Sequence, residues 1–234
     1  MAYFLNLPMS KRKFNTYNYK ITALLEQFSN LSSYLSNEQI AIISTDLVFT
    51  ANQDRVHLSW NSNGKETHFS SGDDLIFISQ YIEMYYNRMF HFMLKDGSLI
   101  RFNYEFKGRD LVSQNLLWWP CPIKGLKINP TEDIDSVIDR LNGKVKAEEI
   151  IMRSPLRVDY DCLIDTQSHP LCHMHFENPD TRLALNKPLC IYGFMEFIFG
   201  NFYPAIKIDF SKWDKIKLEK NSSNIEYEYI LAIR

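Results

Sequence analysis

Apolar and polar positions alternate along this chain with two periods, one typical of helices and the other of strands. Helical spacing of apolar residues predicts helices over residues 17–35, 74–88, 131–141 and 191–203. Alternation with a period of two predicts strands over residues 55–60, 156–161, 171–176, from Arg182 onward, and 225–233. Residues 40–43 fit either a buried strand or a short helix.

The clearest local signal is a β-hairpin. Two apolar runs, 89–94 and 99–106, flank the tetrapeptide 95–98, in which Asp96-Gly97 is typical of a tight hairpin turn. The following segment, 116–122, is extended and limited by prolines, which predicts an edge strand or a packed loop.

These elements predict an α+β fold: a mostly antiparallel mixed sheet with three to four helices packed on it. The chain shows no internal repeat and no low-complexity linker. We therefore expect one domain over residues 1–234, with a soft division near 142–149.

The composition of the chain argues against some classes of function and location. The 234 residues are 45% hydrophobic and 23% charged, as in ordinary globular proteins, and the net charge of -2 argues against a global nucleic-acid-binding field. The four cysteines have irregular spacing and are expected to be reduced. The apolar stretch 189–206 is interrupted by Glu196 and Pro204, so we expect no membrane span and a cytoplasmic protein.

Candidate chemistry gathers between residues 153 and 203. Histidines two apart on a strand, His173 and His175, emerge on one face, and a neighbouring strand can bring Asp159, Asp161 and Arg157 beside them. Imidazoles and carboxylates in such an arrangement act as general acids and bases or hold a divalent metal.

We take His173, His175, Asp159, Asp161 and Arg157 as candidate catalytic residues. The candidate metal ligands are His169, His173 and Asp159, with Mg²⁺ or Mn²⁺ expected ahead of Zn²⁺. Two alternatives remain open: a polar sheet face without chemistry, and a structural zinc site that uses His169, Cys162 and Cys172, whose spacing matches no standard zinc module.

Two weaker signals stand outside this stretch. Asp96 followed by Glu105 and Lys107 resembles the spacing of acids and lysine in one nuclease superfamily. An Asp-Gly turn and a solvated hairpin face are the favoured explanation of these residues. Trp118 and Trp119 are adjacent, so one of them is a candidate for an exposed stacking or partner-binding position; packing beneath the 120–122 loop is the favoured alternative.

Several segments of the chain resemble a bacterial domain family of unknown function. They are Asp96-Gly97 with its flanks, residues 157–161, His169-Pro170 with His173, Arg182, and the helix end at 197–203. The similarity covers about residues 70–205. Members of that family look like partners encoded beside a helicase in anti-phage defence loci. The resemblance implies a defence component that works with a helicase, and it transfers no catalytic residue.

Two functional hypotheses follow. The first is a metal-dependent nuclease effector acting on DNA or RNA, in which Arg157 or Arg182 clamps a phosphate and Trp119 contributes to substrate binding. The second is a non-catalytic binding or regulatory subunit of a defence complex, which predicts an exposed apolar patch near Trp118 and Trp119.

Overall fold

A computed structural model describes most of the chain. The described residues are 17–18, 20–60, 77–124, 147–151, 153–166, 168–176, 181–215, 219–220 and 230–231. The helices are α1 (Ile21–Asn37), α2 (Phe77–Tyr86) and α4 (Ile191–Phe202), with 3-10 turns η2 (Ala147–Glu149) and η3 (Phe210–Lys212). The helix expected over 131–141 lies outside the described residues.

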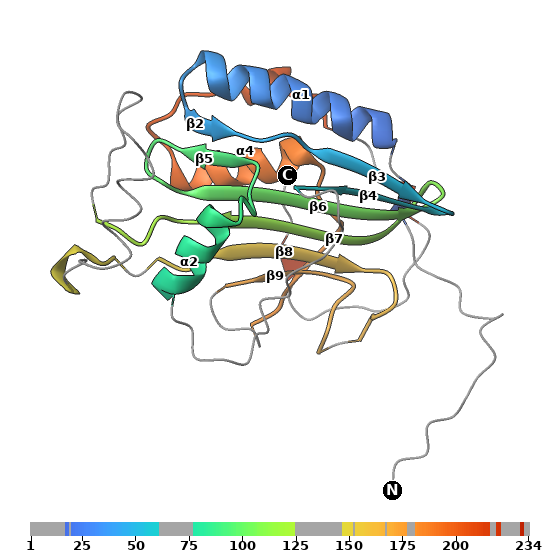
Figure 1. Cartoon of the computed structure of the whole chain (residues 1–234). Helices are drawn as coiled ribbons and strands as arrows, with labels where there is room; N and C mark the ends of the chain where they lie inside the picture. Colours follow the sequence, from blue (N-terminus) through green and yellow to red (C-terminus); the bar gives the residue numbers. More distant parts are fainter. Residues whose placement is uncertain are drawn as a thin grey trace, which may run out of the picture.

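Strands form the centre of the molecule (Figure 1). They are β1 (Tyr17–Asn18), β2 (Ala41–Ser44), β3 (Val48–Asn52), β4 (Arg55–Ser59), β5 (Phe92–Leu94), β6 (Leu99–Lys107), β7 (Asp110–Trp119), β8 (Leu156–Asp161), β9 (Cys172–His175), β10 (Leu183–Leu185), β11 (Glu219–Lys220) and β12 (Ile230–Leu231). The longest are β6 and β7, which pair antiparallel. The fold class is α+β, as expected from the sequence.

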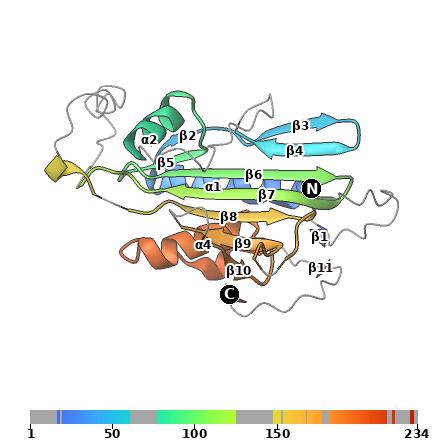
Figure 2. The same ribbon diagram turned by 90° about the horizontal axis from the view of Figure 1, so that it is seen from below.

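The main path through the sheet runs in the order β12-β10-β9-β8-β7-β6-β4-β3. Figure 2 shows β6, β7 and β8 side by side, with the β3–β4 hairpin on one side and β9 and β10 on the other. The described pairs are antiparallel except for β10 with β12, so the sheet is mixed. Because β7 and β8 are neighbours, the chain before and after residues 142–149 belongs to the same sheet.

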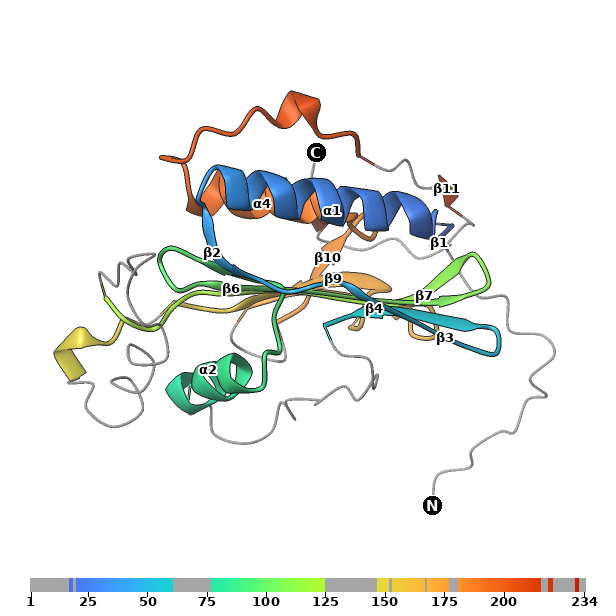
Figure 3. The same cartoon turned by 45° about the horizontal axis from the view of Figure 1, so that its top comes forward.

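The sheet carries an apolar core on each face. Helices α1 and α4 cover one face and α2 lies on the other (Figure 3). The larger core includes Phe102 and Tyr104 of β6 with Phe194 of α4, and the smaller one joins Tyr81 of α2 to Leu117. Burial on both faces explains the continuous apolar run 116–119 at the end of β7, whereas β6 alternates between apolar and polar residues from Ile100 to Lys107.

The hairpin at Asp96-Gly97 confirms its sequence signature. Gly97 has φ of 80°, a conformation that favours glycine, and Asp96 accepts hydrogen bonds from the Ser98 amide and hydroxyl, both at 3.0 Å. The helix expected from residue 17 begins instead at Ile21, because Tyr17–Asn18 pairs with β7 as a short strand. Residues 40–43 largely form strand β2.

The expectation of an edge strand or loop at 116–122 is wrong. Leu116 to Trp119 complete β7, an internal strand between β6 and β8, and Pro120 marks only its end. Trp118 packs into the larger core and Trp119 into the smaller one, at 4% and 5% exposure. Neither tryptophan is exposed, because a sheet covered on both faces buries two adjacent side chains at once.

No helix in the described part of the chain has the length and apolar character needed to cross a bilayer.

Candidate functional site

The candidate site forms where β8 and β9 pair. The register sets Asp159 opposite His173 and Arg157 opposite His175, and residues directly opposite share a face. The intervening Val158 and Met174 turn into the larger core beneath α1 and α4. The sequence prediction that the imidazoles emerge beside acids on one face is therefore confirmed.

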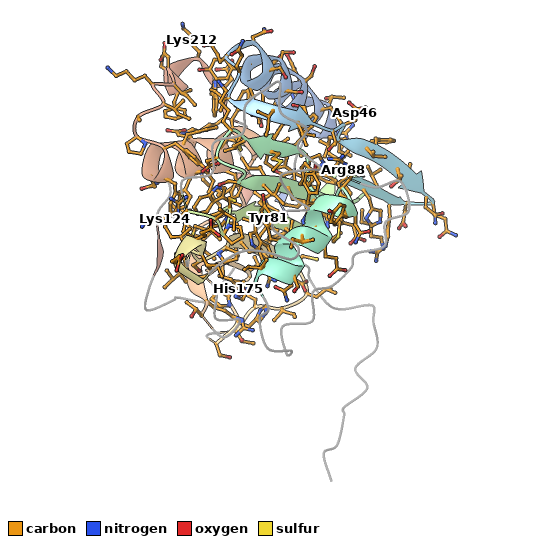
Figure 4. All side chains as sticks on the ribbon, turned by 60° about the vertical axis from the view of Figure 1, so that its left-hand side comes forward. Asp46, Tyr81, Arg88, Lys124, His175 and Lys212 are labelled. Carbon is orange, nitrogen blue, oxygen red and sulfur yellow. The ribbon has the colours of Figure 1, made fainter. Side chains whose placement is uncertain are left out.

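Three side chains converge in this pair of strands. Asp159, His173 and His175 each offer one ligand atom, and these atoms all lie within 4.8 Å of one another. The Nε2 atoms of His173 and His175 are 2.9 Å apart, and Nε2 of His175 is 3.2 Å from Oδ2 of Asp159. In Figure 4, His175 lies at the opposite side of the molecule from Lys212 on the C-terminal segment.

His173 presents an unprotonated nitrogen to this cluster. Its Nδ1 lies 2.7 Å from the Pro170 carbonyl oxygen, which can only accept, so Nδ1 carries the hydrogen and the lone pair of Nε2 faces Nε2 of His175 at 2.9 Å. Burial lowers the pKa of His173 to about 4, so the ring is neutral at physiological pH. A neutral imidazole with one fixed nitrogen hydrogen is the form that binds metals.

Asp159 stays ionised. Its Oδ2 accepts from Arg157 Nε at 2.7 Å, and its Oδ1 accepts from Asn115 Nδ2 at 2.7 Å. Burial acts to raise the pKa of this carboxyl, but the hydrogen bond from His175 and the charge of Arg157 outweigh it, so the pKa lies below its ordinary value. The cluster therefore contains a carboxylate rather than a carboxylic acid.

A polar chain behind Asp159 orients the carboxylate. Asn115 on β7 accepts from Arg101 Nη2 at 2.9 Å, and the Arg101 guanidinium lies 4.5 Å from the ring centre of Trp60. Neither Asn115 nor Arg101 was among the residues predicted from the sequence. The available signal was the polar run Ser113-Gln114-Asn115 within β7, whose outer members Ser113 and Asn115 share one face of the strand.

His169 and Arg182 border the cluster. The His169 ring is 4.6 Å from the His173 ring, centre to centre, and burial and the charge of Arg182 lower the pKa of His169. Arg182 directly precedes β10, whose register with β9 places it next to His175. Within the described part of the chain, His169 Nδ1, His175 Nδ1 and Arg182 Nε are buried and accept or donate no hydrogen bond. Unpaired polar atoms around one cluster are typical of a site that takes water or an ion.

The structure changes the composition of the expected metal set. His175, rather than His169, supplies the ligand atom that joins His173 and Asp159. Asp161 does not join them, because its Oδ1 accepts from the Leu163 amide at 2.8 Å and closes the turn after β8. Arg157 is part of the cluster through its ion pair with Asp159.

The expected zinc set does not form among the described residues, and Trp119 does not reach a substrate site. Cys162 and Cys172 lie in the larger core, on the face opposite the histidines, and burial raises the pKa of Cys162 to about 11, so they do not combine with His169 as a zinc site. Trp119, expected in substrate binding, is buried in the smaller core.

The nuclease-like set of Asp96, Glu105 and Lys107 is also separated. Asp96 lies in the turn, whereas Glu105 lies nine residues further along, about 30 Å for an extended chain. Glu105 pairs with Arg55, and Lys107 lies 3.5 Å from Asp54, as expected for a solvated hairpin face.

The converging atoms have spacings that suit a metal ion. Neighbouring ligand atoms stand roughly 2.8–3.0 Å apart around a six-coordinate ion with bonds of about 2.0–2.1 Å. Around four-coordinate zinc the corresponding spacing is roughly 3.3–3.6 Å. The observed 2.9 Å between the two imidazole nitrogens matches the six-coordinate spacing, and the 3.2 Å between His175 and Asp159 lies between the two spacings. Two imidazoles and one carboxylate on one side of an ion leave its other positions for water or substrate.

The molecule is thus an α+β protein with a two-histidine, one-carboxylate cluster on one sheet face. Residues 42–229 match the family described as Uncharacterized conserved protein (DUF2290), and the chain belongs to this family. No curated protein and no solved structure matches the chain.

Proposed function

We propose that this protein is a metal-dependent nuclease that acts with a helicase partner in anti-phage defence. The observation that carries the enzymatic part is the convergence of Asp159, His173 and His175 within 4.8 Å. The defence and helicase part rests on the sequence resemblance set out above.

The cluster has the groups that metal-assisted hydrolysis needs. A divalent ion held by these three residues lowers the pKa of a bound water and polarises a phosphate oxygen. Arg157, whose Nε already binds Asp159, has further N–H donors for a second phosphate oxygen. Side-chain exposure rises from 8% for His175 through 18% for Asp159 to 36% for Arg157, so a substrate approaches from the Arg157 side.

The donor set favours some metals over others. Mg²⁺ prefers oxygen ligands and keeps most of its water, whereas imidazole suits zinc better; manganese also favours oxygen ligands but accepts imidazole nitrogen more readily than Mg²⁺ does. Of the two metals expected from the sequence, two histidines and one carboxylate favour Mn²⁺, and the same ligands suit Zn²⁺.

The test is a nuclease assay with purified protein, Mn²⁺ or Mg²⁺, labelled DNA or RNA, and the helicase encoded nearby. Cleavage that is abolished by EDTA and by His175→Ala, and retained by Asp161→Asn, supports the proposal. Asp161 is a matched control because it lies on the same strand and face as Asp159 but outside the ligand set. Full phage protection by folded Asp159→Ala and His173→Ala variants would exclude a catalytic role.

One observation favours the second candidate, a non-catalytic regulatory subunit. His173 and His175 are only 1% and 6% exposed, which suits an ion or hydrogen-bond cluster that stabilises the fold as well as it suits catalysis. In that case His175→Ala lowers stability and weakens the helicase complex, while no nucleic acid is cleaved under any metal. Co-purification of the partner in high salt, compared between wild type and His175→Ala, measures this directly.

A further inference from the structure

A second polar and aromatic cavity lies on the opposite face of the sheet. It has a volume of about 410 Å³, and its lining includes Asp96, Trp118, Arg153, Phe176, Phe202 and Tyr203. Trp118 and Asn115 are three apart on β7, so they point to opposite faces, and the cavity is separate from the Asp159 cluster. The volume falls within the range of about 300–1,000 Å³ that is usual for small-molecule sites.

One wall of the cavity is a fixed aromatic platform. The rings of Trp118 and Phe202 stack with centres 4.3 Å apart and planes at 29°. Trp118 is buried, whereas Phe202 is 40% exposed, so Trp118 supports one side of the Phe202 ring while another part of the ring is accessible to solvent. Such a surface accepts a planar ring by stacking.

Tyr203 ties this platform to the hairpin turn. Its hydroxyl accepts from Trp118 Nε1 at 3.2 Å and donates to Asp96 Oδ2 at 3.1 Å. The end of α4, the end of β7 and the β5–β6 turn are therefore joined by one hydrogen-bonded chain. Asp96 and Tyr203 are far apart in the sequence, and the fold brings them to the same cavity.

The polar groups of the cavity include both an acceptor and a donor that can form further hydrogen bonds. Oδ1 of Asp96 accepts only the Ser98 amide among the described contacts, and a carboxylate oxygen accepts two donors. Arg153 Nη1 is 3.9 Å from Asp96 Oδ2, beyond hydrogen-bond range, and its side chain is 45% exposed. The guanidinium is therefore positioned to bind an anion, and the carboxylate to accept an N–H group.

We propose that this cavity binds a nucleotide whose base carries an amino group. The base stacks on Phe202, its amino group donates to Asp96, and its phosphate accepts from Arg153. A nucleotide combines in one small ligand the planar ring, the N–H donor and the anion that the cavity separately accommodates. The inference rests on the geometry of this cavity and does not depend on the metal-dependent nuclease.

The chemistry fits both a free nucleotide and a nucleotide unit within a single strand. Isothermal titration in EDTA separates the two sources, with AMP in one arm and a short oligo(dA) in the other. AMP binding identifies a free-nucleotide site, and oligo(dA) binding without AMP binding identifies a strand-binding site. Absence of both overturns the proposal.

Further ligands and variants test each contact. Adenosine lacks the phosphate, and purine riboside 5′-monophosphate lacks the amino group but keeps the purine ring; each is expected to bind about tenfold more weakly than AMP, the effect of one hydrogen bond to a charged group. Arg153→Gln is expected to weaken AMP by about the same factor and to leave adenosine unchanged. Phe202→Leu weakens both ligands.

Asp159→Asn serves as the control for the metal cluster and leaves nucleotide binding unchanged. Arg153 and Phe202 are substantially exposed, so their variants fold, which circular dichroism verifies. Equal AMP affinity in wild type, Arg153→Gln and Phe202→Leu contradicts the proposed site. A failure of the nuclease assay with intact AMP binding refutes only the metal-dependent function.

Discussion

Replacing Asp159 by asparagine isolates the contribution of its negative charge. The carboxylate accepts from Arg157 at 2.7 Å, from Asn115 at 2.7 Å and from His175 at 3.2 Å, with 18% of the side chain exposed. A hydrogen bond to a charged group contributes about 1.5–3 kcal/mol, against about 0.5–1.5 kcal/mol for a neutral one. The Arg157 side chain is 36% exposed, so solvent screens its ion pair with Asp159 and reduces the contribution of that pair to the free energy of unfolding. We expect Asp159→Asn to lower the free energy of unfolding by about 2 kcal/mol at pH 7.

The pH dependence gives this prediction a second signature. The folded-state pKa of Asp159 lies below the unfolded value, so its contribution is complete above the unfolded pKa of about 4 and is lost as the pH falls through the folded pKa. The stability difference between wild type and Asp159→Asn therefore shrinks as the pH falls below the unfolded pKa of about 4.

Urea unfolding in EDTA, followed by tryptophan fluorescence, measures both effects without metal. Asp161→Asn is the matched control, because the asparagine oxygen still accepts the Leu163 amide, and its expected change is within about 0.5 kcal/mol. Equal stability of wild type and Asp159→Asn at pH 7, or a difference that grows towards acid, would refute the argument.

Three further predictions concern the cores. Burial lowers the pKa of His91 to about 3, so between pH 6.5 and pH 3 the unfolded state binds a proton on His91 that the folded state does not. The free energy of unfolding therefore falls by up to about 1.4 kcal/mol per pH unit as the pH is lowered. His91→Asn keeps an acceptor for the Phe102 amide and should remove this contribution of His91 to the pH dependence, as measured by urea unfolding at several pH values. Trp119→Ala is expected to cost about 3–5 kcal/mol of unfolding free energy, and a thermal midpoint equal to that of wild type would contradict its buried position. Phe102→Ala, at 0% exposure between β6 and α4, should cost about as much by chemical denaturation, with the milder Phe102→Leu as its control.

Local patterns were sufficient to predict much of the fold. The Asp96-Gly97 turn, the alternation in 156–161 and the helical stripe of 191–203 each depend on neighbouring residues, and each element forms. The 116–122 segment could not be placed in the same way. Residues 116–119 form part of an internal strand because β6 and β8 pair with β7 on either side, and those strands are distant in the sequence. The two adjacent tryptophans are both buried because helices cover both faces of the sheet.

The candidate site was predicted only as far as single strands allowed. The spacing of His173 and His175 fixed their common face, but the register of β8 against β9 decided that Asp159, and not Asp161, lies opposite His173. The exchange of His169 for His175 as a ligand follows from the same register. The support from Asn115 and Arg101 comes from β7 and β6, which no local pattern connects to residues 157–175.

Metal binding tests the central claim most directly. After removal of metal with EDTA, calorimetric titration with Mn²⁺ should show one ion per chain in wild type and in Asp161→Asn, with at least about tenfold weaker binding in His175→Ala and Asp159→Asn. No binding to the wild type, or equal binding by all four proteins, would show that Asp159, His173 and His175 do not form a metal site.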